Sequence, residues 1–242
     1  MRLEVDIASK AFKSAAGEQR EVLAGITFTL GAGEVGVFVG PSGCGKSTML
    51  RILAGLDPDF QGRVSRPAGA RIGMVFQEPR LLPWRSVEDN VRLAAPQADE
   101  AKLSALFAIL ELSAHRSDFP GELSLGLARR VAFARAFAVE PDFLILDEPL
   151  ASLDDALAAR LRDQIAMLVD SRSVMTLLVT HDLDEAVRLG DRLFLLSPRP
   201  ARIIADLPIP TPRNARGEAE IAAIKADIAR RIDGDRTERD VS

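Results

Sequence analysis

An α/β fold with a mostly parallel sheet is predicted for this chain from two stretches of its sequence. Residues 143–196 alternate between short apolar runs and segments whose apolar residues recur at helical spacing. Residues 34–39 form another apolar run, which is followed by a glycine-rich stretch and then by a helical pattern at 47–54. Strands that alternate with helices pair in parallel, because each helix returns the chain to the end of the sheet where the next strand starts.

The elements are expected in the following order. Residues 1–39 read as several short antiparallel strands, with a turn at Gly31-Ala-Gly33. Residues from about 86 to 139 are expected to be mostly helical, because Ser86 is a suitable N-cap residue and an apolar stripe follows at 99–112. The other expected strands lie at 71–76, 143–146, 174–179 and 193–196, and the other expected helices at 155–169 and 183–189.

These elements predict one main domain and a short extension. The domain covers residues 1–206, with the helical subdomain at about 86–139 inserted into it. Prolines at 208, 210 and 212 mark the start of the extension, residues 207–242. The extension contains one amphipathic helix, which is expected to dock on the domain or on a partner. The apolar face of that helix carries Ile221, Ile224, Ile228 and Ile232.

Composition excludes several classes of function. The chain has 242 residues, of which 47% are hydrophobic and 27% charged, and its net charge of −4 gives no reason to expect nucleic acid as a partner. No apolar run is long enough to span a bilayer, and the N-terminus lacks the apolar core of a signal peptide, which predicts a cytoplasmic protein. The single cysteine, Cys44, is interpreted as a small filler residue rather than a redox-sensitive thiol.

A phosphate-binding loop follows the apolar run at 34–39. The spacing G-x-x-x-x-G-K-[ST] is matched by Gly40, Pro41, Ser42, Gly43, Cys44, Gly45, Lys46, Ser47 and Thr48. Glycines let backbone N–H groups approach a triphosphate, and the following helix turns its positive end toward the phosphates. Lys46 is suited to reach the β- and γ-phosphates, and Ser47 to complete the shell of a Mg²⁺ ion. A chance match in a chain of this length is about a one per cent event.

A pair of carboxylates ends the apolar strand predicted at 143–146. Asp147 and Glu148 would lie at the carboxyl edge of the sheet, where α/β sheets bind ligands. Asp147 is suited to hold Mg²⁺, and Glu148 to orient the water that attacks a γ-phosphate. A strand that merely stops at a solvated acidic turn is the alternative, and the phosphate loop upstream makes it the weaker one.

The segment between these two motifs carries a family resemblance. Leu123-Ser124-Leu125-Gly126-Leu127 precedes a helical pattern and resembles the L-S-G-G-Q signature of the nucleotide-binding subunits of ABC transporters. The resemblance covers roughly residues 3 to 206, and further elements of the family appear in order. They are Phe12 at the position of the adenine-stacking aromatic residue, Gln77 in the Q-loop, Asp154 in the D-loop sequence Ala151-Ser-Leu-Asp, and the switch histidine His181.

This resemblance implies a role for each element. His181 would contact the γ-phosphate, and Gln77 would contribute to the Mg²⁺ site and to catalysis. Two copies would face each other head to tail, so that Ser124 and Gly126 of one copy contact ATP on the other. Simpler readings stay open: Gln77 as an exposed loop residue, His181 as a histidine satisfied at a strand end, Asp154 as a helix cap and Phe12 as a core residue.

The signature departs from the family at Leu125 and Leu127, where the family has glycine and glutamine. Leu125 adds a side chain at a point of close backbone approach. We expect the backbone amide to serve while the side chain points away. The neighbouring Arg129 and Arg130 are expected to form local ion pairs rather than a nucleic-acid surface.

Residues 78–87 indicate which transporters the chain resembles. Glu78-Pro-Arg-Leu-Leu-Pro-Trp84 is similar to the element found in importers of nitrate, sulfonates and taurine. The implied partners are transmembrane permease subunits and a periplasmic or extracellular solute-binding protein, with the chain at the cytoplasmic face of the membrane. The alternatives are a lipid-trafficking ATPase of the same fold and an ABC ATPase without a transport role. Nothing in the chain reads the solute directly.

Overall fold

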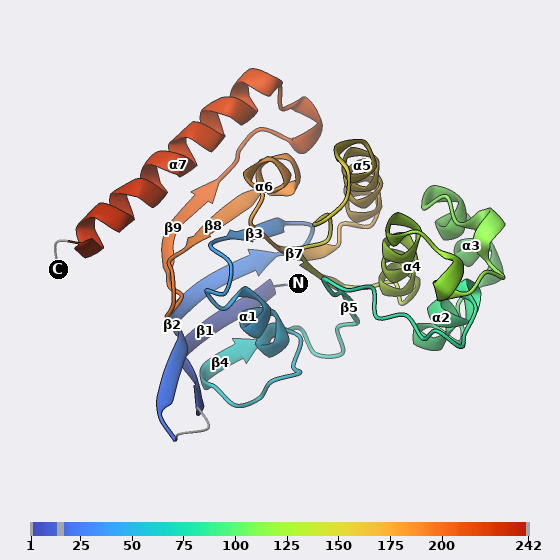
Figure 1. The fold of residues 1–242 in the computed structure, drawn as a ribbon, viewed down its shortest axis with the longest axis horizontal. Coiled ribbons are helices and arrows are strands. Elements are labelled where there is room, and N and C mark those ends of the chain that lie inside the picture. The colour runs from blue at the N-terminus through green and yellow to red at the C-terminus, as the bar shows by residue number, and fades with distance from the viewer. Residues whose placement is uncertain (1, 14–16, 241–242) are drawn as a thin grey trace. The chain divides into compact units, whose positions relative to one another are not determined.

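The computed structural model describes residues 2–13 and 17–240, with side chains described up to residue 231. The chain, drawn as a ribbon in Figure 1, divides into two compact units. The first unit comprises Met1–Ala68 and Leu177–Ser242, and the second comprises Gly69–Thr176.

An antiparallel sheet begins the first unit. It contains β1 (Arg2–Lys13), β2 (Gln19–Gly31) and β4 (Gln61–Ser65) in the order β2-β1-β4. Side chains of β1 alternate between exposed and buried positions, as expected of a strand with one face on a core. The two long strands replace the several short ones expected from the sequence.

The first unit also holds strands of the larger, mostly parallel sheet. Their order is β7 (Met175–Thr180), β3 (Val35–Val39), β8 (Arg192–Leu196) and β9 (Ile203–Pro208). β3 pairs in parallel with β8, and β9 runs antiparallel to β8 as the edge strand. Three aromatic rings form part of the core, with centroids 4.7 to 5.1 Å apart: Phe28, Phe38 and Phe194.

Three helices belong to this unit: α1 (Lys46–Leu53), α6 (Leu183–Leu189) and α7 (Glu218–Asp240). α7 packs against α6, so the C-terminal helix docks on its own chain (Figure 1). Ile221 and Ile228 are buried and Ile224 is half-buried, whereas the side chain of Ile232 lies outside the described residues. Arg188 of α6 pairs with Glu218 at 2.8 Å, which adds an ionic contact to this apolar one.

The second unit combines two parallel strands with most of the helices. β5 (Ile72–Val75) pairs with β6 (Phe143–Asp147). α2 (Val87–Ala94) and α3 (Glu100–Ile109) pack on α4 (Leu125–Ala138), and α5 (Asp155–Arg172) follows β6. This unit includes more residues than the inserted helical subdomain expected at 86–139. The bounds of that subdomain remain a prediction.

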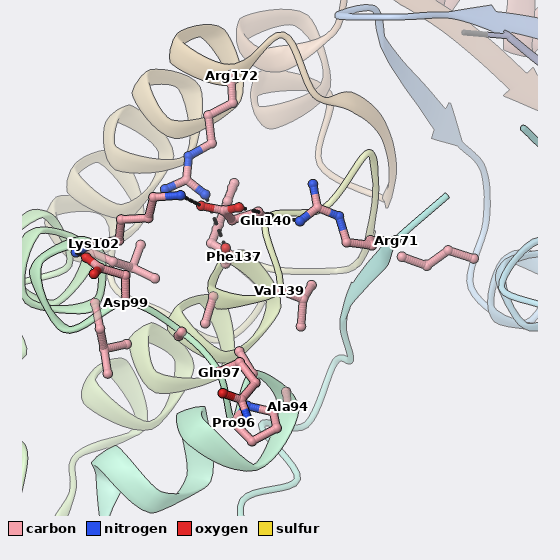
Figure 2. Close-up of a pocket in the computed structure, with 16 residues that line it drawn as sticks. Arg71, Ala94, Pro96, Gln97, Asp99, Lys102, Phe137, Val139, Glu140 and Arg172 are labelled. Carbon is pink, nitrogen blue, oxygen red and sulfur yellow. Dashed lines mark hydrogen bonds and ion pairs between the residues drawn. The ribbon is translucent and has the colours of Figure 1, made fainter. Parts of the chain in front are cut away.

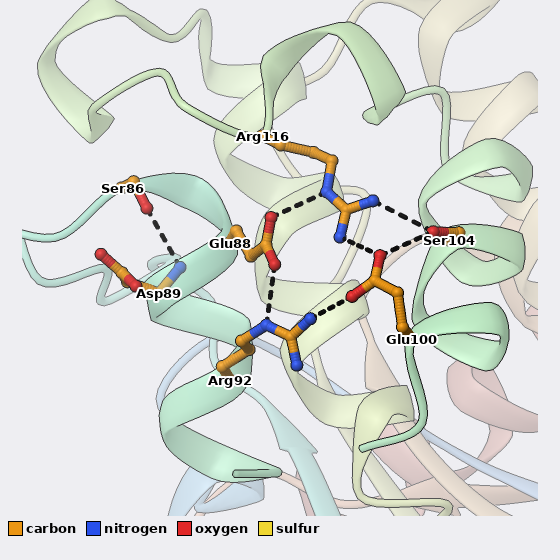
Figure 3. Close-up of polar contacts among 7 residues, drawn as sticks. All are labelled: Ser86, Glu88, Asp89, Arg92, Glu100, Ser104 and Arg116. Carbon is orange, nitrogen blue, oxygen red and sulfur yellow. Dashed lines mark hydrogen bonds and ion pairs between the residues drawn. The ribbon is translucent and has the colours of Figure 1, made fainter. Parts of the chain in front are cut away.

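A network of charged side chains joins α2, α3 and the turn that follows α3 (Figure 3). Arg116 donates to Glu88 at 2.8 Å and to Glu100 at 2.7 Å, and Arg92 pairs with the same two carboxylates. Hydrogen bonds from Arg116 and Arg92 hold the pKa of Glu88 below its usual value. The helical part of this unit therefore owes some of its stability to partly exposed ion pairs as well as to its apolar core.

Two strands were not expected from the sequence. β4 reads Gln-Gly-Arg-Val-Ser and β9 is half-exposed along its length, so neither has the apolar run or alternation that marks a strand. Both are edge strands, whose pairing is set by the sheet beside them. Among the described residues, no helix is both long enough and apolar enough to cross a membrane.

Candidate functional site

The phosphate loop lies between β3 and α1, as the motif requires. Lys46 is buried at the start of α1, and its Nζ donates to the carbonyl oxygens of Gly40 at 2.8 Å and Pro41 at 3.1 Å. The loop therefore curls around the lysine. No side chain caps α1, and its first turn holds no acidic residue, so the positive end of this helix is suited to an anion.

Glycine is required at two points of this loop. Gly45 has φ of 132°, and a Cβ there would lie 2.9 Å from side-chain atoms of Val22 and Leu23. A Cβ on Gly40 would lie 2.9 Å from Cβ of Leu196. Strands β2 and β8 thus press closely on the loop, and only glycine fits there.

Cys44 behaves as a filler residue. The thiol is 2% exposed, and burial raises its pKa above the ordinary value, although the charge of Lys46 opposes this. Because the thiolate is the reactive form, a raised pKa opposes reactivity. This favours the packing interpretation over a redox role.

Phe12 lies near the end of β1 and is not a core residue. Its side chain is 46% exposed, and Lys10 Nζ lies 4.7 Å from the centre of the ring. Lys10 is itself buried and pairs with Asp57 at 2.9 Å, which fixes the cation against the ring. The core alternative is therefore wrong, and the exposed ring is available for stacking.

His181 follows β7, the neighbour of β3 in the sheet, and is exposed. The residues on either side of it, Thr180 and Asp182, are held by hydrogen bonds. Thr180 donates its hydroxyl to Glu185 at 2.5 Å and accepts a hydrogen bond from the Asp182 amide at 3.0 Å, while Asp182 caps α6 by accepting from the Asp184 amide. These bonds hold the turn that carries His181.

The second unit holds the two carboxylates. Asp147 ends β6 and is 7% exposed, and Glu148 follows it with φ of 46°, which is uncommon for a residue other than glycine. Gln77 follows β5 and is exposed. Because β5 and β6 are parallel, Gln77 and Glu148 leave the sheet at the same edge. Asp154 caps α5 by accepting from the Leu157 amide at 3.0 Å, so the helix-cap reading is correct.

The signature residues begin α4. Ser124 is its N-cap and accepts a hydrogen bond from the Leu127 amide at 3.3 Å. The Leu125 side chain is 47% exposed, so it does not pack inside its own chain. Gly126 is buried, and a Cβ there would lie 2.4 Å from Cδ2 of Leu157. This glycine therefore leaves room for the end of the Leu157 side chain, which would have to move if a Cβ were added.

Arg129 and Arg130 differ from each other in their contacts. Arg130 pairs with Glu111, as expected. Arg129 donates to the carbonyl oxygens of Glu148, Pro149 and Ala151. Sequence reasoning missed this contact, because main-chain acceptors 19 to 22 positions away leave no signal in residue type.

The second unit also contains a cavity of about 570 Å³ that none of the predicted site residues lines (Figure 2). It lies at the start of β5, where Arg71 and Ile72 contribute to its wall. Glu140 pairs with both Lys102 and Arg71, so charged groups of the wall already neutralise one another. Gln77 lies at the opposite end of β5, the carboxyl end at which α/β sheets bind ligands.

The fold and these motifs define a phosphate-loop nucleotide-binding protein of the α/β class. Residues 23–151 match the family model described as ABC transporter. An aliphatic sulfonates import ATP-binding protein of Burkholderia cenocepacia, SsuB 2, is 41% identical over 93% of this chain and 85% of its own length. One of Pseudomonas aeruginosa, SsuB 1, is 43% identical over 89% of this chain and 92% of its own length.

The chain belongs to the ABC transporter family, as an ATP-binding subunit with ATPase function. Its fold is that of the dimeric structure of MJ0796, a bacterial ABC transporter cassette, with a TM-score of 0.74 and 25% identity over 90% of this chain and all of that one. A post-hydrolysis structure of the same cassette bound to ADP and Pi has a TM-score of 0.72 and 24% identity.

Proposed function

We propose that this chain hydrolyses ATP to drive a membrane importer of aliphatic sulfonates or of related small solutes such as taurine and nitrate. The observation that carries this proposal is its 41% identity to an aliphatic sulfonates import ATP-binding protein over 93% of the chain. The Leu-Leu-Pro-Trp element that ends at Trp84 supports the same group. Trp84 is 70% exposed on the chain.

ATP is held by the first unit in this proposal. Lys46 and the amides around it bind the phosphates, and Phe12 stacks on adenine. Support comes from the uncapped start of α1, the glycines that keep the loop open, and the exposed ring of Phe12. The other loop residues, from Pro41 to Thr48, line the same phosphates.

Mg²⁺ is assigned to Ser47, Gln77 and Asp147. These residues offer hydroxyl, amide and carboxylate oxygens, which suit this ion's preference for oxygen ligands. When bound, Mg²⁺ would neutralise charge on the phosphates.

Hydrolysis is assigned to Glu148 and His181. Glu148 accepts a hydrogen bond from the attacking water and orients it, and His181 contacts the γ-phosphate. Lys46 stabilises negative charge on the phosphates, and Gln77 would contribute to the metal site and to catalysis. Binding and positioning thus account for most of the rate, as in other phosphoryl transfers.

Two copies would enclose two ATP molecules in this proposal. Ser124, Gly126 and the loop ending at Asp154 contact the nucleotide held by the other copy. Leu125 is exposed on its own chain, and in this proposal its side chain points away from that nucleotide while its amide serves. ATP binding without dimerisation or hydrolysis, even with membrane partners present, would rule that expectation out.

The proposed partners are transmembrane permease subunits and a solute-binding protein outside the membrane. The chain would then be peripheral, at the cytoplasmic face. To identify the solute, the complete transporter is reconstituted in liposomes and its ATPase rate is measured with an alkanesulfonate, taurine or nitrate. Stimulation by none of the three would contradict the proposed solute class.

The assigned role of Glu148 predicts the largest single effect in the chain. Glu148→Gln removes the carboxylate but keeps its size, so ATP binding persists while hydrolysis falls about 1000-fold. The variant should also accumulate as an ATP-bound dimer, which size-exclusion chromatography detects. Hydrolysis near the wild-type rate would remove Glu148 from this role.

A further inference from the structure

Arg129 is a buried arginine of α4 whose guanidinium reaches the chain that follows β6. It is 4% exposed. Its Nη1 donates to the carbonyl oxygens of Glu148 at 3.2 Å and Pro149 at 2.9 Å, and its Nη2 donates to that of Ala151 at 2.6 Å. A guanidinium presents its donors in one rigid plane, so this side chain fixes several carbonyl groups of one short segment at once.

The segment held by Arg129 has a backbone that most residue types avoid. φ is 46° at Glu148 and 64° at Ser152, and neither residue is glycine. Such conformations persist only where the surrounding structure holds them. Because the carbonyl group and the side chain of Glu148 share one Cα, fixing the carbonyl also restricts the direction of the Cα–Cβ bond that carries the carboxylate.

We propose that Arg129 is a positioning residue for ATP hydrolysis. It holds the backbone of residues 148–151 and thereby keeps the Glu148 carboxylate aimed at the attacking water. This inference rests on the proposed function, in which Glu148 orients that water. Arg129 acts through the main chain of the segment, so it is not a catalytic residue itself.

The position of Arg129 on α4 also connects the segment to the signature. Ser124 caps the helix, and Arg129 lies five residues later, about 7.5 Å along the helix axis at 1.5 Å per residue. A shift of α4 caused by contact between Ser124 and ATP of the other copy would therefore move residues 148–151 as well. Arg129 thus ties the geometry of Glu148 to the nucleotide that the opposite copy holds.

Arg130 provides a matched control. It is the next residue of the same helix, is 5% exposed, and binds the Leu110 carbonyl and the Glu111 carboxylate. Loss of either guanidinium leaves buried acceptors unsatisfied, so both variants should lose stability. Of the two arginines, Arg129 is the one that hydrogen-bonds to residues 148–151, so its loss should affect hydrolysis beyond that general cost.

The test compares Arg129→Gln with Arg130→Gln in the full-length chain, using Mg-ATP in single-turnover and steady-state assays. We expect Arg129→Gln to lower kcat about 100-fold with KM for ATP nearly unchanged, since a displacement of about 1 Å at a reacting group has this effect. Arg130→Gln should keep a kcat close to that of the wild type. Melting temperatures report the stability loss that the two variants share.

Hydrogen exchange gives a second readout that does not depend on turnover. The amides of residue 148 and residues 150–154 should exchange faster in Arg129→Gln and at the wild-type rate in Arg130→Gln. Unchanged exchange in Arg129→Gln, or an equal loss of kcat in both variants, would overturn the proposal.

Glu148→Gln is assayed in parallel to separate two kinds of failure. If it loses hydrolysis while Arg129→Gln does not, the positioning role is wrong and the role of Glu148 stands. If Glu148→Gln hydrolyses ATP normally, the assignment of Glu148 fails first and the positioning role fails with it.

Discussion

The phosphate loop and the acidic segment that follows β6 (residues 148–152) have similar surroundings, but their backbone conformations are stabilised in different ways. Each follows a five-residue strand that is fully buried. Both need backbone with positive φ, which the phosphate loop has at Gly43 and Gly45 and the acidic segment has at Glu148 and Ser152. In the first loop the residue type permits the conformation, whereas in the second residues other than glycine adopt it, and Arg129 of α4 hydrogen-bonds to carbonyl groups of the same segment.

This difference shows that one part of a site can be recognised from the sequence while another part cannot. A glycine can be recognised in the sequence at the position where the positive φ is needed. The left-handed conformation costs other residues about 1 to 2 kcal/mol each. In the positioning role proposed for Arg129, its hydrogen bonds to the carbonyls of Glu148, Pro149 and Ala151 offset part of that cost, so part of the information that shapes the second loop would lie on α4.

The sharpest test of the first loop is Gly45→Ala. With φ of 132° and neighbours at 2.9 Å, alanine there should lower the free energy of unfolding by about 3 kcal/mol, since strain and overpacking combine. Nucleotide affinity should fall with it, and titration calorimetry measures this. Gly43→Ala is the control, because φ is 76° and nothing lies within 4 Å, so about 1 kcal/mol is expected. Equal losses would show that close packing at Gly45 does not matter.

The signature glycine should give an intermediate effect. Gly126→Ala places a Cβ 2.4 Å from Leu157, so the free energy of unfolding should fall by about 2 kcal/mol. Urea unfolding of this variant and of Gly126→Ala/Leu157→Ala measures the clash, because the second change makes room. No recovery in the double variant relative to Leu157→Ala alone would contradict a packing role.

Strain in the acidic segment predicts that a substitution there raises the free energy of unfolding instead of lowering it. Ser152→Gly should raise the free energy of unfolding by about 0.5 kcal/mol, because relief of the left-handed conformation slightly exceeds the added freedom of the unfolded chain. Ser173→Gly is the control, since Ser173 ends α5 with φ of 48° outside the segment. Destabilisation by Ser152→Gly alone would mean that the serine side chain, rather than the backbone, determines this position.

The smallest effect is expected in the charge network of the helices. The pKa of Glu88 is lowered in the fold, so its contribution is present above its unfolded pKa of about 4.3 and is lost as pH falls through the folded value. Glu88→Gln should therefore cost about 0.4 kcal/mol near neutral pH, and this difference should shrink in acid. Urea unfolding at several pH values checks this, with Glu78→Gln in an exposed loop as the control. A cost that did not depend on pH would exclude the ion pairs as its source.

Much of the fold followed from patterns of a few residues. The strands at 143–147 and 175–180 lie within one residue of the bounds expected from their mainly apolar sequences, and α6 lies at 183–189 as expected. β4 and β9 were missed because an edge strand can be polar and take its pairing from its neighbour. Likewise, the Asp154 cap followed from local sequence, whereas the contact of Arg129 did not.

The sequence by itself determined the phosphate loop, the acidic strand end and the family, because these depend on residue types at short, fixed spacing. Only the tertiary structure decided that Phe12 is exposed, that Gly126 is packed against Leu157 and that Arg129 holds the chain beyond Glu148. The physical reason is the range of the interaction. Glycine and capping residues act on their own backbone, whereas burial and hydrogen bonds to main-chain carbonyls depend on which distant segments meet.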